Sequence, residues 1–66
     1  MSKQPLANRE IIIEFYPIGN YMKVSAMDVE TLTEVSVQGP VNGARETLKN
    51  NALKRLEYVM KKKGLI

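Results

Sequence analysis

The sequence has no cysteine and no histidine among its 66 residues. Without cysteine, disulfides and thiolate metal sites are excluded, and without histidine the commonest ligand of zinc, copper and nickel is missing. The usual acyl-transfer triads need one of these two residue types as well. We therefore expect no metal ion, no cofactor and no enzymatic activity.

Long apolar runs are missing too. No stretch of 18 consecutive apolar residues is present, so we expect no membrane-spanning helix. Residues 1–8 are mostly polar and include one proline, so we expect a disordered tail. They lack the apolar run of a signal peptide, so we expect none. Together with the lack of cysteine, these features favour a soluble protein of the cytoplasm.

The short chain allows one domain and a thin stability margin. A domain of this size buries only about 60% of the surface of its unfolded chain. Disulfides, a metal ion or a partner subunit usually supply the missing stability, and the composition disfavours the first two. A homodimer is therefore expected.

Three segments have the composition of β-strands. Residues 9–16 contain three consecutive isoleucines and two aromatics, which suit a pleated strand. Residues 21–28 alternate apolar Met22, Val24 and Ala26 with polar Lys23, Ser25 and Asp28. Residues 34–38 alternate Val35 and Val37 with polar neighbours, so all three strands are expected to bury one face.

The parity of the apolar positions fixes the expected register. A two-residue turn at Gly19-Asn20 places Phe15 opposite Val24, with both side chains on the buried face. A four-residue loop at residues 29–32 likewise places Val24 opposite Val37. The last position of that loop, Leu32, is expected to be left-handed, a conformation in which glycine would be comfortable.

One helix is predicted after the third strand. Gly39-Pro40 should end the strand, and Asn42 or Gly43 can cap a helix that runs over residues 44–63 and stops at Gly64. Its apolar side chains recur at helical spacing. The expected fold is α+β, a three-stranded antiparallel sheet packed against one long C-terminal helix, with the domain at residues 9–63 and a short C-terminal end at residues 64–66.

The sheet face turned away from the helix is the predicted dimer interface. Under the expected register it carries an apolar set made up of Ile12, Tyr16, Ile18, Tyr21 and Met27. Apolar patches of this kind often mark contacts, and an unpaired first strand would be an aggregation hazard. The short link at residues 39–43 also allows a domain-swapped dimer, in which the helices are exchanged.

Charge is divided unequally along the chain. Residues 1–43 carry three Lys or Arg and five Asp or Glu, whereas residues 44–66 carry seven and two. The basic half indicates a surface for an acidic partner, with Lys54, Arg55, Lys61 and Lys62 as the candidate contacts. An interaction protein or adaptor with an unknown protein partner is the favoured function. Nucleic-acid binding through the basic helix is the alternative, and a small-molecule module is a third option.

Several short segments point to a family. Ile18-Gly19-Asn20-Tyr21, Lys23-Val24-Ser25-Ala26, Glu34-Val35-Ser36-Val37, Gly39-Pro40 and Leu56-Glu57-Tyr58-Val59 resemble a family of short, uncharacterised proteins typical of alphaproteobacteria. The resemblance covers residues 10–62. Some members carry the name of serine hydroxymethyltransferase, a much longer enzyme whose pyridoxal phosphate lysine has no counterpart here. The family usually has glycine where this chain has Leu32. The resemblance implies no activity and no site residues.

Overall fold

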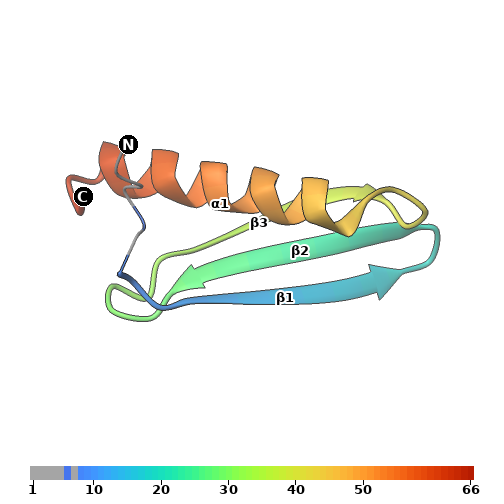
Figure 1. The fold of residues 1–66 in the computed structure, drawn as a ribbon, viewed down its shortest axis with the longest axis horizontal. Helices are drawn as coiled ribbons and strands as arrows, with labels where there is room; N and C mark the ends of the chain where they lie inside the picture. Colours follow the sequence, from blue (N-terminus) through green and yellow to red (C-terminus); the bar gives the residue numbers. More distant parts are fainter. Residues whose placement is uncertain (1–5, 7) are drawn as a thin grey trace.

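A three-stranded sheet and one helix make up the fold (Figure 1). The computed structural model describes residue 6 and residues 8–66. The elements are β1 (Ile11–Ile18), β2 (Tyr21–Asp28), β3 (Glu34–Pro40) and α1 (Arg45–Lys62). The strands are antiparallel in the order β1-β2-β3, which confirms the predicted α+β fold.

The register of both hairpins agrees with the prediction from apolar parity. Phe15 lies opposite Val24, and Val24 lies opposite Val37. Because a slip of one residue would turn every apolar side chain to the other face, burial under the helix specifies this register strongly.

The two turns reach their geometry in different ways. Gly19 has a φ of 60°, as the first central position of a type II′ turn requires. In the second turn the Asp28 N–H donates to the Thr33 carbonyl at 2.8 Å, which closes a four-residue loop. Leu32 ends this loop with a φ of 60° and is 71% exposed, so the predicted left-handed leucine is confirmed.

The helix is one residue shorter at each end than predicted, and its N-terminal cap also differs from the prediction. Ala44 is the N-cap residue and makes no side-chain capping bond, so the predicted cap at Asn42 or Gly43 is wrong. β3 also continues through Pro40 instead of stopping before it. At the C-terminus, Gly64 has a φ of 75° and the Leu65 N–H donates to the Met60 carbonyl at 2.8 Å. This is a Schellman motif, and it confirms the predicted stop.

The core lies between α1 and the inner face of the sheet. Every fourth residue of the helix is buried (Leu48, Ala52, Leu56 and Met60) against Met22, Val24 and Ala26 of β2. A Cβ atom on Gly39 would lie 2.6 Å from Leu48 Cδ2, so glycine permits the close approach of the helix to β3. α1 packs against β2 and β3, and in Figure 1 β2 lies between the helix and β1.

Both sheet edges contain a proline at the same end. The Val29 N–H donates to the Glu10 carbonyl, so alternate residues from Glu10 onward direct their backbone groups toward β2. Pro17 falls in the other set, which faces solvent. In β3, the Thr33 carbonyl accepts from the Asp28 N–H, so the odd-numbered residues direct their backbone groups toward β2. The backbone nitrogen of Pro40 therefore faces the outer edge of the sheet. Neither proline therefore removes a hydrogen bond from the sheet.

Candidate interaction surfaces

The free edge of β1 has an inner face that is only half-buried. Its outward backbone groups belong to Ile11, Ile13 and Phe15, by the alternation described above. The side chains of these three residues point to the helix side of the sheet and pack against the core but are only half-buried, and α1 packs mainly against the other two strands. The Arg45 guanidinium lies 5.1 Å from the centre of the Phe15 ring. The edge therefore presents backbone donors and acceptors beside an apolar row.

The predicted dimer-interface residues lie on the outer face of the sheet in two separate groups. Ile12 lies opposite Met27 at one end, and Ile18 lies opposite Tyr21 at the other. Ile12, Ile18 and Tyr21 are each 40–43% exposed, and Met27 is half-buried. Since a strand rises about 3.3 Å per residue, the two groups are roughly 20 Å apart.

A polar cluster around Tyr16 separates these two apolar groups. The Tyr16 hydroxyl donates to the Glu14 carboxylate, and Lys23 Nζ lies 5.6 Å from the centre of the Tyr16 ring. The hydrogen bond to Glu14 raises the pKa of the Tyr16 phenol. Ser25, on the same face, is only 3% exposed. The structure thus brings the five predicted residues onto one face but not into one continuous apolar patch.

A cleft of about 380 Å³ lies against the second half of β1. It is lined by Phe15, Tyr16, Pro17, Ile18, Lys23 and Glu34. The mixture of an aromatic ring, an amine and a carboxylate would suit a small polar molecule. A function as a small-molecule-binding module would use this cleft.

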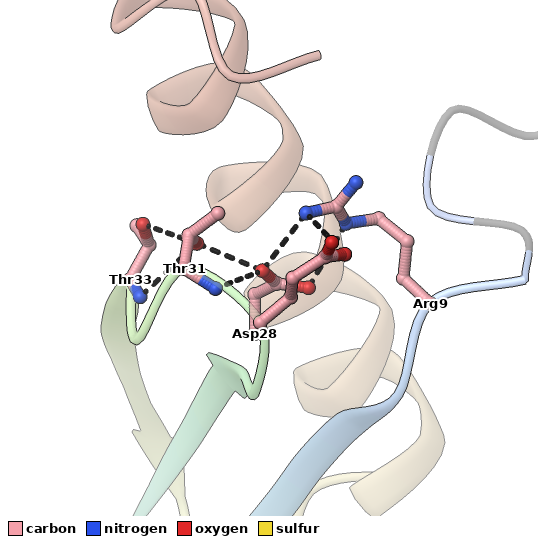
Figure 2. Close-up of polar contacts among 5 residues, drawn as sticks. Arg9, Asp28, Thr31 and Thr33 are labelled. Atoms are coloured by element: carbon pink, nitrogen blue, oxygen red, sulfur yellow. Dashed lines mark hydrogen bonds and ion pairs between the residues drawn. The ribbon is translucent and has the colours of Figure 1, made fainter.

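The strongest polar site joins the segment before β1 to the turn after β2 (Figure 2). Arg9 Nε donates to Asp28 Oδ1 and Arg9 Nη2 donates to Asp28 Oδ2, both at 3.0 Å. The Thr31 N–H and hydroxyl donate to Asp28 Oδ2 at 2.9 and 2.8 Å, and the Thr31 hydroxyl also contacts that of Thr33 at 2.8 Å. The Asp28 side chain is fully buried, and Glu30 adds an exposed carboxylate 3.4 Å from Arg9 Nη2.

This site holds the Asp28 carboxylate in its charged form. The two hydrogen bonds from Arg9 lower the pKa of Asp28 far below its usual value, and the bonds from Thr31 act in the same direction against the effect of burial. The sequence prediction grouped Asp28 with the solvent-facing residues of its strand, which is wrong. Its even number, shared with Met22 and Val24, was the available signal that it faces inward.

Leu6, the first described residue of the chain, packs against the core, and its carbonyl accepts from the Arg9 N–H at 3.3 Å. Asn8 follows it with a φ of 66°. Residues 1–5 and 7 lie outside the described residues, so the disordered tail at residues 1–8 stays a prediction.

The basic residues predicted to face an acidic partner share one side of α1. Lys54, Arg55, Lys61 and Lys62 are all exposed. Lys61 Nζ lies 3.0 Å from the Glu57 carboxylate, and Lys62 Nζ lies 5.7 Å from the centre of the Tyr58 ring. Tyr58 itself is 61% exposed and was not singled out from the sequence. Its spacing of three or four residues from each of the four cations was the available signal.

No helix in the described part of the chain has the length and apolar character needed to cross a membrane. Across residue 6 and residues 8–66, no three acidic side chains gather in a way that could hold a metal ion.

The chain matches a known family of proteins. Residues 8–63 match a family described as Domain of unknown function (DUF6898). The chain belongs to this family. The DUF6898 match begins just before Arg9 and ends at the last turn of the helix, so it includes both the Arg9–Asp28 site and the basic face of α1. No curated protein and no solved structure matches the chain.

Proposed function

We propose that this DUF6898 protein is a small, non-enzymatic interaction protein of the cytoplasm that assembles as a homodimer through the free edge of β1. One observation carries the proposal: β1 is an unpaired edge strand whose inner side chains are only half-buried, and α1 packs mainly against β2 and β3. Long apolar edges are usually protected in native proteins, and a second copy would protect this one.

Charge along β1 selects how two copies would pair. For the two inner faces to lie on the same side, opposed residues must have numbers of equal parity. Pairing centred on Glu14 would oppose two carboxylates directly, which is destabilising. Pairing centred on Ile13 avoids this contact. It places Ile11 of each copy opposite Phe15 of the other, and it joins the two sheets into one continuous sheet.

The apolar row of each copy would then be completed by the other. Ile11, Ile13 and Phe15 from both chains would lie in the groove between the two helices, where burial of apolar surface stabilises association by about 25 cal/mol per Å² before the costs of binding. The outer face, with Ile12 and Met27 at one end, would remain available to a protein partner, which supports a role as an adaptor or accessory subunit. The described chain folds α1 onto its own strands, and helix exchange stays a prediction.

The absence of cysteine makes the proposal easy to test. In the Ile13-centred pairing, the two Ile13 residues form a hydrogen-bonded pair with Cα atoms about 5.5 Å apart, which is within the range for a disulfide. Ile13→Cys should therefore give a cross-linked dimer on mild oxidation. Val37→Cys, on the inner face of β3, is the matched control and should not.

Sedimentation of the unmodified protein should show a dimer that dissociates on dilution. A monomer at every concentration, or equal cross-linking of the Ile13 and Val37 variants, would overturn the proposal. Circular dichroism of each variant checks that the cysteine has not unfolded the domain.

A further inference from the structure

The outer face of α1 is built around an exposed aromatic ring. Tyr58 is 61% exposed, whereas the tyrosines of the sheet are about 40% exposed. On a helix surface, the neighbours of a residue are those three and four positions away. For Tyr58 these four neighbours are Lys54, Arg55, Lys61 and Lys62, so every flanking position is cationic.

The acidic residues of the helix lie off this face. Glu46 and Glu57 are the acids of α1. Glu57 is half-buried beside the core stripe and Glu46 lies in the first turn. Glu57 pairs with Lys61, but Lys54 and Arg55 have no ion-pair partner among the described residues. The positive charge around Tyr58 is therefore largely uncompensated.

We infer that this face binds single-stranded nucleic acid, with a base stacked on the Tyr58 ring and phosphates on the surrounding cations. An aromatic ring within a cationic track is the arrangement that such binding uses, because every base has a stacking face and every nucleotide carries a charge. The cations from Lys54 to Lys62 span roughly 12 Å of helix at 1.5 Å per residue, which is enough for a short run of nucleotides.

Two considerations disfavour a membrane or a duplex as the partner of this face. The apolar stripe of α1 is buried against the sheet, so the helix cannot lay an apolar face into a membrane. A duplex would meet the cations through its phosphates but would offer Tyr58 no unstacked base. The Lys62 amine lies 5.7 Å from the centre of the Tyr58 ring, so a base that stacks on this face displaces it, and the displaced amine stays close enough to contact the phosphate of the same nucleotide.

The test measures fluorescence anisotropy of labelled short oligouridine, with duplex DNA, polyglutamate and anionic vesicles as competitors. Tyr58→Ala should weaken binding roughly tenfold or more, and Tyr58→Phe, which keeps the ring, should restore it. Lys54→Gln with Lys62→Gln should weaken binding and reduce the dependence of log K on log salt by about 1.4, which corresponds to two phosphate contacts on a single strand.

Lys23→Gln is the matched control, because Lys23 also lies over a tyrosine ring but on the sheet. It should leave the affinity unchanged. The inference is overturned if oligouridine does not bind at low salt, if Tyr58→Ala binds as well as the unmodified chain, or if duplex, polyglutamate or vesicles compete as strongly as the single strand. The sedimentation behaviour of Tyr58→Ala should match that of the unmodified chain, so failure here is distinct from failure of the β1 dimer.

Discussion

The buried carboxylate of Asp28 accepts two hydrogen bonds from the guanidinium of Arg9, which lies 19 residues earlier in the sequence. The contact ties the segment before β1 to the turn after β2 (Figure 2). A buried charge that loses its partner is costly, so the loss of either residue should destabilise the folded state.

Asp28→Asn should lower the thermal midpoint more than Glu30→Gln does. The amide keeps the size of the side chain but leaves the Arg9 guanidinium without its buried counter-charge, whereas Glu30 is 77% exposed and contributes little. Thermal unfolding followed by circular dichroism gives the comparison. Equal midpoints for the two variants would contradict the assignment of Asp28 as the central acceptor, and Arg9→Ala added to the Asp28→Asn variant should cause little further loss.

Stability should fall in acid for the same reason. The pKa of Asp28 is lowered in the folded chain, so the folded state binds fewer protons there than the unfolded state. The contribution is complete above the unfolded value, about 3.9, and is lost as pH falls toward the lower folded pKa. Urea unfolding between neutral pH and strong acid should show this decline, and Asp28→Asn should show a shallower one. Parallel pH profiles would rule out Asp28 as the source.

The Tyr16 phenol should titrate above its ordinary range, and Glu14→Gln should bring it back. The hydrogen bond to Glu14 favours the protonated phenol and raises its pKa. The stabilisation is therefore present below about pH 10, the unfolded value, and disappears as pH rises through the folded pKa. Ring chemical shifts of Tyr16 against pH measure the effect directly. An identical titration in the Glu14→Gln variant would show that Glu14 is not responsible.

Leu32→Gly should stabilise the protein by about 1 kcal/mol, because the left-handed conformation costs a residue with a Cβ atom roughly that amount or more. Leu32 is 71% exposed, so little packing is lost. Leu32→Ala provides the control, since it removes the same side chain but keeps the Cβ atom. The prediction fails if urea unfolding gives the same stability for the Gly and Ala variants.

Gly39→Ala should destabilise the protein by about 1–3 kcal/mol through overpacking. The added Cβ would lie 2.6 Å from Leu48 Cδ2, which is itself in the core. In a Leu48→Ala background the same change should cost almost nothing, because the clashing atoms are gone. Additive effects in the double variant would mean that the space near Gly39 is limited by something other than Leu48.

Apolar parity and the choice of turns together predicted the sheet. The positions of Phe15, Val24 and Val37 excluded the loop lengths that would turn their side chains to opposite faces, and a two-residue turn at Gly19-Asn20 and a four-residue second loop then gave both registers. The left-handed Leu32 followed from the same count. The helix stop at Gly64 was equally readable, since its conformation is a local property.

Other features depend on contacts between segments distant in the sequence. The even number of Asp28 could have predicted that it faces inward, but nothing local to Asp28 indicates that Arg9 would bind it. The alternation of strand residues also predicts which face of the sheet is buried. It does not predict which strands the helix covers. The half-exposed state of Ile13, on which the assembly proposal depends, could therefore come only from the three-dimensional structure.

The placement of the two prolines limits how far this sheet could template the growth of a fibril. Pro17 lies opposite Met22 and Pro40 lies opposite Tyr21, so both outer strands lose their outward donor near the Gly19-Asn20 turn. A chain added to either edge could form a ladder only along the remainder of the strand. Repeated edge-to-edge addition would carry this gap through every layer, which favours small closed assemblies over amyloid-like polymers.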